Sequence, residues 1–131
     1  MFNFKRLQES FRYARQGLSH VWRHEQNFRI QCWVASVVIL AMLVFRVTLG
    51  EAIVLTMMII FVLVLELVNT IFEKFVDILK PRLHSYVGVI KDMMAAAVLI
   101  AAVGATAIAL MVFLPYCLEW VQLLQYGYGQ R

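Results

Sequence analysis

Three long apolar stretches alternate with polar segments along the 131-residue chain. They cover residues 28–47, 52–72 and 93–114, and each approaches the roughly 20 residues that a helix needs to cross a bilayer. Arg29 and Arg46 flank the short uncharged part of the first stretch, where long basic side chains can reach the aqueous interface. The pattern therefore predicts three transmembrane helices.

The segment before the first apolar stretch has a different periodicity. Apolar residues recur there every three or four positions, with lysine and arginine between them. An apolar stripe opposite a basic face is typical of a helix that lies in the membrane interface. We predict such an interfacial amphipathic helix within residues 1–27; a soluble helix packed on a core is the alternative. The stripe consists of Phe4, Leu7, Phe11, Ala14, Leu18, Val21 and the adjacent Trp22.

Composition agrees with a membrane protein. The chain is 63% hydrophobic and 15% charged, whereas soluble domains carry about 25% charged residues. We therefore expect one all-α integral membrane domain over residues 1–131. Nucleic acid is an improbable partner, because the basic residues of the first segment alternate with an apolar face that the bilayer explains.

The distribution of basic residues predicts the topology. Residues 1–29 contain six Lys and Arg, the connection 74–92 contains four, and the connection between the first two spans contains only Arg46. Basic loops stay in the cytoplasm. The N-terminus and residues 74–92 are therefore expected on the cytoplasmic side, and the C-terminal tail 115–131 outside.

An acidic stripe ends the second apolar stretch. Glu66, Asn69, Glu73 and Asp77 are spaced by three, four and four residues, so a helix places all four on one face. Ionisable residues at membrane depth are costly, and their default interpretation is a functional site. The alternative is the end of a helix that surfaces into a polar loop.

The stripe permits phosphoryl-transfer chemistry. Two carboxylates can hold Mg²⁺ together with phosphate oxygens, and a deeper carboxylate could take a proton from a hydroxyl. Glu25 lies where the amphipathic helix reaches the first span, and Lys91-Asp92 opens the third. Neither GxxxxGK[ST] nor GxGxxG occurs, so no known phosphate-binding loop is visible.

Three motifs occur in order. The first is ELVNTxxExxVD, from Glu66 to Asp77; the second is KDMxAAAVLI, from Lys91; the third combines Tyr13, Gly17-Leu18, Trp22, Glu25 and Asn27-Phe28-Arg29. In these motifs the chain resembles the prokaryotic diacylglycerol kinase family, which includes undecaprenol kinases. The resemblance covers roughly residues 6–102.

The resemblance implies a small three-span enzyme that phosphorylates a membrane lipid alcohol with ATP and Mg²⁺. It also implies a bacterial inner-membrane location and a homotrimer whose active sites draw on neighbouring chains. It assigns Glu66 as the catalytic base, Glu25 and Glu73 as metal ligands that also bind nucleotide, and Asn69 and Asp77 as supporting residues. The further nucleotide-side positions are Arg6, Tyr13, His84, Lys91 and Asp92.

Some positions depart from the family pattern. Gln31 stands where a histidine or glutamate is common, and the bulky Ile71 and Phe72 follow the Asn-Thr pair. These departures leave diacylglycerol and undecaprenol open as acceptors.

Two other functions compete with the kinase. One is a small non-enzymatic transporter or channel whose intramembrane carboxylates carry protons or cations. The other is a membrane scaffold with an acidic helix end. A transporter gives no reason for Glu25 and Lys91-Asp92 to accompany the acidic stripe.

Overall fold

The computed structural model describes residues 3–79 and 84–128, and these form helices without strands. Three of the helices contain stretches long and apolar enough to cross a membrane, Gln26–Phe45, Leu49–Ile78 and Tyr86–Gln125. The prediction of an all-α membrane fold with a leading amphipathic helix is confirmed. The helices are α1 (Phe4–His24), α2 (Gln26–Phe45), α3 (Leu49–Leu79) and α4 (His84–Tyr128).

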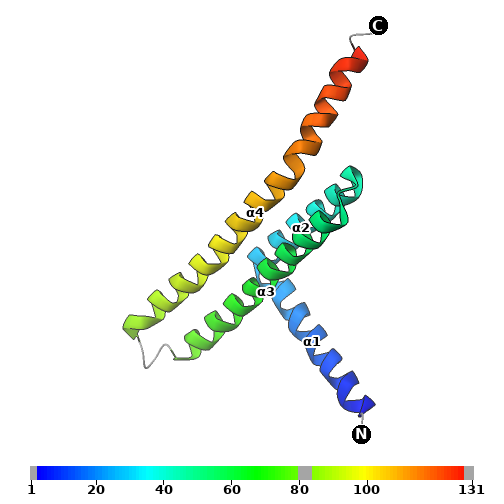
Figure 1. Ribbon diagram of the computed structural model, residues 1–131. Helices are drawn as coiled ribbons and strands as arrows, with labels where there is room; N and C mark the ends of the chain where they lie inside the picture. The colour runs from blue at the N-terminus through cyan, green and yellow to red at the C-terminus, as the bar shows by residue number, and fades with distance from the viewer. Residues whose placement is uncertain (1–2, 80–83, 129–131) are drawn as a thin grey trace.

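Helix α1 leaves the other helices at a steep angle (Figure 1). Glu25 adopts an extended conformation that separates α1 from α2. The Arg29 guanidinium fixes this elbow, since Nη1 donates to the carbonyl oxygens of Trp22 at 2.9 Å and Arg23 at 3.2 Å. Residues 3–20 are all exposed in the protomer, so the apolar stripe of α1, apart from the buried Val21, is open to contact a membrane surface.

A short turn joins α2 to α3. Arg46 ends α2 in the left-handed conformation (φ 50°), and α3 begins at Leu49, three residues before the predicted start of the span. Glu51 in the first turn of α3 accepts hydrogen bonds from the backbone nitrogen and the hydroxyl of Thr48, at 2.8 and 2.7 Å. These bonds satisfy groups that a helix N-terminus would otherwise leave without partners.

Helices α3 and α4 are longer than the predicted spans. Helix continues to Leu79 and resumes at His84, so only residues 80–83 of the predicted connection 74–92 lie outside the described helices. A helix of 31 residues is about 46 Å long at ~1.5 Å per residue, against roughly 30 Å for the hydrocarbon core. The polar end of α3 is therefore expected to extend beyond the hydrocarbon core.

The predicted C-terminal tail is also helical as far as Tyr128, although Pro115 lies inside α4. Side chains from this part of α4 contact the α2–α3 end of the bundle. The Tyr116 hydroxyl donates to Glu51 Oε2 at 2.7 Å, and the Phe45 ring lies 5.8 Å from that of Phe113 and 6.2 Å from that of Trp120. These contacts hold the C-terminal part of α4 against the bundle, and α4 then continues past the α2–α3 turn (Figure 1).

Helix α3 is the centre of the bundle and packs against both α2 and α4, which touch each other little. Its buried residues share one face, with the apolar Leu55 and Val62 towards the α2–α3 turn and polar residues further along. One side of α3 therefore carries both the packing contacts and the acidic stripe. The buried polar residues are Glu66, Asn69 and Thr70.

Candidate functional site

Glu66 lies at the junction between the apolar and polar halves of the buried face of α3. Its side chain is only 3% exposed. The Gln31 amide nitrogen on α2 donates a hydrogen bond to Glu66 Oε2 at 3.0 Å. A buried carboxylate is costly unless it is hydrogen-bonded, and Gln31 supplies that bond from the neighbouring helix. Glu66 is thus a fixed carboxylate at membrane depth.

One and two turns further along α3 lie Asn69 and Glu73. The Asn69 amide nitrogen donates to Glu73 Oε1 at 3.3 Å. Asn69 is 7% exposed, and its Oδ1 is buried without a hydrogen-bond partner among the described residues. Glu73 is half-buried. Glu66 also lies within electrostatic reach of Glu73 and of Glu25. This end of α3 therefore gathers oxygen atoms of negative or partly negative charge.

Two ion pairs bring cations to these carboxylates. Lys74 Nζ lies 3.2 Å from Glu25 Oε1 and joins α3 to the elbow between α1 and α2. Lys91 Nζ lies 2.8 Å from Asp77 Oδ1 and joins α4 to α3. Both pairs are partly solvent-accessible, so we expect each to contribute only modestly to folding stability. Their main effect is on position, because they hold ammonium groups beside the carboxylates, where a phosphate could bind.

The structure brings together only part of the predicted set. Glu25, Glu66, Asn69, Glu73, Asp77 and Lys91 gather around the acidic half of α3. Asp92, beside Lys91 on α4, is exposed.

The other three predicted positions are not part of this group. Arg6 and Tyr13 are exposed on the diverging α1, and no interaction in the described part of the chain joins them to the group. Tyr13 instead lies under the Arg12 guanidinium, 5.4 Å from the ring centre. His84 begins α4, and its side chain is outside the described residues.

The side-chain oxygen atoms at this site are the type of ligand that Mg²⁺ prefers. They are oxygens, from Glu25, Glu73 and the unpartnered Oδ1 of Asn69, and Mg²⁺ is normally bound through one or two carboxylates together with phosphate oxygens and water. Across residues 3–79 and 84–128, no three His, Cys, Asp or Glu side chains converge closely enough to hold a metal ion. A metal at this position would therefore need further ligands, which a nucleotide phosphate can supply.

Two residues of this arrangement were not predicted as site residues. In the sequence, Gln31 is a departure from the family pattern, and Lys74 is one of the basic residues that predict the topology. Gln31 did carry a signal, since it is an amide in an otherwise apolar span, and such residues commonly hydrogen-bond across helices. Lys74 directly follows Glu73, but its partner Glu25 lies on another element, and only the fold brings the two together.

Comparison with known proteins identifies the family of this chain. Residues 12–113 match the family described as prokaryotic diacylglycerol kinase. The chain belongs to the prokaryotic diacylglycerol kinase family. The match includes α2, α3, the elbow at Glu25 and the ion pair between Lys91 and Asp77. The family expected from the three motifs is confirmed, and so is a lipid kinase as the class of enzyme.

The relatives that this chain resembles differ in the lipid that their names give. A diacylglycerol kinase of Synechocystis sp. is 35% identical over 81% of this chain and 61% of its own length. An undecaprenol kinase of Bacillus subtilis is 31% identical over 84% and 89%, and a diacylglycerol kinase of Haemophilus influenzae is 33% identical over 72% and 80%. The chain thus matches less than two thirds of the Synechocystis relative but most of the other two. Both lipid alcohols are represented at similar identity.

Proposed function

We propose that this protein transfers the γ-phosphoryl group of ATP to the hydroxyl of a membrane lipid alcohol, either diacylglycerol or undecaprenol. The observation that carries the proposal is Glu66, a buried carboxylate held by Gln31 where an apolar helix face becomes acidic. A lipid hydroxyl can reach this depth from the membrane. Mg-ATP can reach Glu73, about 10 Å further along α3 at ~1.5 Å per residue, from the aqueous side.

In the proposed step, Glu66 acts as general base. One carboxylate oxygen is oriented by the Gln31 amide, and the carboxylate takes the proton of the lipid hydroxyl. The lipid oxygen forms a bond to the γ-phosphorus while the bond from that phosphorus to the bridging oxygen of ADP breaks. The products are ADP and a lipid phosphate, and the proton remains on Glu66 until it is lost to solvent.

Charge at the polar end of α3 supports nucleotide binding. Phosphoryl transfer depends on positioning and on electrostatic stabilisation of the transferred group. Lys91 and Lys74, which lie beside carboxylates in this structure, would face phosphate oxygens, and Glu25, Glu73 and Asn69 would hold Mg²⁺. When bound, the metal would neutralise phosphate charge. The family resemblance adds Asp92 to the nucleotide site. It also adds Arg6 and Tyr13, which would reach the site if α1 of another chain approaches it. His84 is assigned on that resemblance alone.

The proposal includes an orientation and an assembly. The acidic half of α3 faces the cytoplasm of the bacterial inner membrane, because the basic residues of α1 and of the α3–α4 connection favour that side. A homotrimer would bring α1 of one chain to the site of another. This supplies a reason for Arg6 and Tyr13 to stand apart within one protomer.

The test of the proposal is a transfer assay. Purified protein in lipid nanodiscs is expected to move labelled γ-phosphate from ATP to diacylglycerol, to undecaprenol or to both, and EDTA should abolish the transfer until Mg²⁺ is restored. Comparing kcat/KM for the two lipids measures discrimination directly. Ion flux through liposomes without ATP, together with no transfer to either lipid, would contradict the proposal and favour a transporter.

The role of Gln31 gives a second prediction. Replacing Gln31 by leucine leaves the buried Glu66 carboxylate without its amide donor, and hydrogen bonds to charged groups contribute about 1.5–3 kcal/mol. The expected result is a fall in kcat of roughly 10- to 100-fold, with an unchanged KM for Mg-ATP. Gln31→His keeps an N–H donor and should recover most of the rate. Equal kcat values in all three proteins would show that Gln31 does not orient the base.

A further inference from the structure

Two histidines lie one turn apart at the end of α1, close to where this helix leaves the bundle (Figure 1). His20 and His24 are four residues apart, so their side chains share one face of the helix. Their rings are stacked, with centroids 4.3 Å apart and planes inclined at 27°. Both residues are exposed, and His20 lies about 200° around the helix from Leu18 of the apolar stripe. The histidine pair is therefore open to a small ligand from the aqueous side.

The hydrogen bonding of His24 leaves one of its ring nitrogens in the form that binds a metal. His24 Nδ1 lies 2.8 Å from the carbonyl oxygen of His20. A carbonyl oxygen can only accept, so Nδ1 carries the proton, and Nε2 of the neutral ring keeps its lone pair. Histidines that bind metals commonly donate their other ring N–H to a backbone carbonyl, which fixes the tautomer and the orientation of the ring. His24 therefore presents Nε2 as a ligand atom.

Stabilisation of the helix end would explain only one of the two histidines. His24 lies in the last turn of α1, where a positively charged imidazole interacts favourably with the helix dipole. That effect gives no role to His20, whose ring stacks on His24. Two charged rings at this distance would repel each other, whereas two neutral imidazoles can share one metal ion. The pairing itself points to a shared ligand.

The surroundings leave room for a metal ion and its water ligands. Gly17 lies one turn before His20 on the same side of α1, and no side chain beyond its chain neighbours lies within 4 Å of the point where a Cβ would stand. Two nitrogens bound to one Zn²⁺ are about 3.3 Å apart, because each bond is about 2.0–2.1 Å long. Rotation of the exposed His20 ring about its side-chain bonds brings the two Nε2 atoms to that separation. No third His, Cys, Asp or Glu joins the pair within residues 3–79 and 84–128, so water would complete the coordination.

We propose that His20 and His24 bind one divalent transition-metal ion, of the class of Ni²⁺, Cu²⁺ and Zn²⁺, through their Nε2 atoms. Imidazole suits these ions, whereas carboxylate and water suit Mg²⁺, so this site and the proposed Mg²⁺ site at Glu73 select different metals. The inference goes beyond the proposed kinase function and does not depend on it. The bound ion joins residues one turn apart and stabilises the last turn of α1, directly before the elbow at Glu25.

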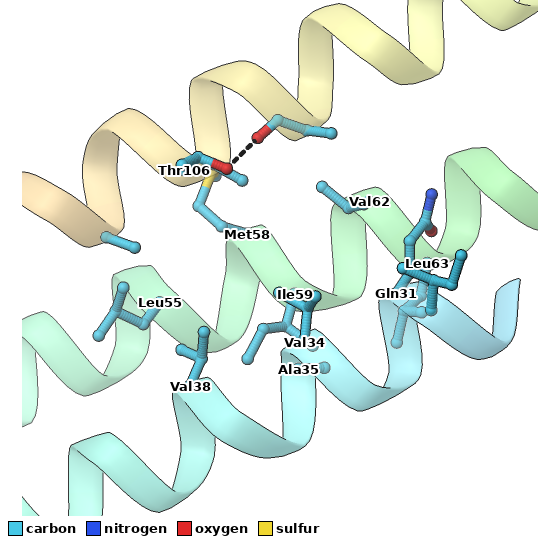
Figure 2. A pocket seen from close by; sticks show the side chains of 14 residues that line it. Gln31, Val34, Ala35, Val38, Leu55, Met58, Ile59, Val62, Leu63 and Thr106 are labelled. Carbon is cyan, nitrogen blue, oxygen red and sulfur yellow. Dashed lines mark hydrogen bonds between the residues drawn. The ribbon is translucent and has the colours of Figure 1, made fainter. Parts of the chain in front are cut away.

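The apolar pocket between α2, α3 and α4 offers no competing site for these ions (Figure 2). None of its lining residues is a His, Cys, Asp or Glu, and the hydroxyl of Thr106 donates to the carbonyl oxygen of Ala102. The free cysteines Cys32 and Cys117 lie on different helices, so each would supply a single ligand. The histidine pair is thus distinct from these features in both position and chemistry.

Isothermal titration calorimetry of the full chain in lipid nanodiscs, purified without a histidine tag, tests the site. Nickel chloride is titrated in the presence of millimolar Mg²⁺, which occupies carboxylate sites. One Ni²⁺ per chain is expected to bind, and the Kd should weaken by about 10-fold or more in His20→Ala and in His24→Ala, because loss of even an outer partner of a metal ligand costs about 10–100-fold. Both side chains are exposed, so without metal the two variants should unfold at the temperature of the unmodified protein.

The spacing of the histidines separates a shared site from two independent ligands. His24→Ala combined with Gln16→His restores a pair four residues apart, at positions 16 and 20, and should recover the Ni²⁺ affinity. His20→Ala combined with Ser19→His keeps the number of histidines but places them five residues apart, and should not recover it. The same Kd in both double variants would overturn the inference, and so would an affinity that is lost in Glu73→Gln but retained in His20→Ala.

Electron paramagnetic resonance of bound Cu²⁺ gives a readout that a purely structural role of the histidines would not change. The unmodified protein should show couplings to two imidazole nitrogens, and His20→Ala to one only. A Cu²⁺ spectrum without imidazole coupling in the unmodified protein would place the ion at carboxylates and refute the site. None of these outcomes depends on lipid phosphorylation, so the metal site and the kinase proposal stand or fall separately.

Discussion

Glu66→Gln is expected to reduce kcat for lipid phosphorylation by about 10²–10⁴-fold, the usual contribution of a general base. The glutamine has nearly the same shape as the glutamate, so the side chain can keep its contact with Gln31, but the amide cannot take the hydroxyl proton. The measurement is the rate of transfer from labelled ATP at saturating lipid and Mg-ATP. Mg-ATP affinity should change little, because Glu73 and Lys91 lie nearer the polar end of the bundle.

Glu51→Gln provides the matched control for this prediction. Glu51 is a glutamate on the same helix, but it lies in the first turn of α3, where it accepts hydrogen bonds from Thr48 and Tyr116. Its replacement should lower thermal stability and leave kcat near that of the unmodified protein. If Glu66→Gln retained full kcat in folded protein, Glu66 would not be the base, and another group would have to receive the proton.

Glu73→Gln is expected to raise KM for Mg-ATP by roughly 10- to 100-fold, the scale of loss found when metal sites are weakened. Glu73 is half-buried and held by the Asn69 amide, so its carboxylate is positioned beside the unpartnered oxygen of Asn69. The neutral glutamine removes a negative charge from the proposed metal site. Raised Mg²⁺ concentration should recover part of the affinity, and steady-state kinetics over a range of Mg²⁺ measures that recovery.

Glu9→Gln, on the exposed face of α1, serves as the control for the loss of one negative charge. Its KM for Mg-ATP should remain unchanged at every Mg²⁺ concentration. The prediction for Glu73 fails if Glu73→Gln shows the same Mg²⁺ dependence as the unmodified protein. The two main variants are also expected to differ in kind, since loss of the base lowers kcat while loss of a metal ligand raises KM.

The spacing of polar residues predicted the acidic face of α3 from the sequence alone. Glu66, Asn69, Glu73 and Asp77 follow helical periodicity within one continuous helix, and a local repeat is enough to place them together. The motif around them also predicted the family, and the family match over residues 12–113 confirms that prediction. Assignment of a catalytic or binding role to each residue remains a prediction.

The positions of Arg6 and Tyr13 relative to the acidic face could not be predicted from helical spacing. They share a motif with Glu25, but the elbow at Glu25 turns α1 away from the bundle, so neighbours in sequence separate in space. For a related reason, the prediction missed the helices that extend into the connection 74–92 and the tail 115–131. Polar or proline-containing segments give weak local signals, whereas the contacts of Lys91 with Asp77 and of Tyr116 with Glu51 join different helices.

Hydrophobic length and helical period, both read from the chain, predict the membrane class, the three spanning helices, the amphipathic first helix and the acidic face. Tertiary packing brings Gln31 to Glu66, Lys74 to Glu25, and Lys91 on α4 to Asp77 on α3. These features depend on how α2, α3 and α4 are rotated and spaced against one another. Residues 35 and 49 positions apart have no periodic relation in the chain, and packing alone brings them within hydrogen-bonding distance.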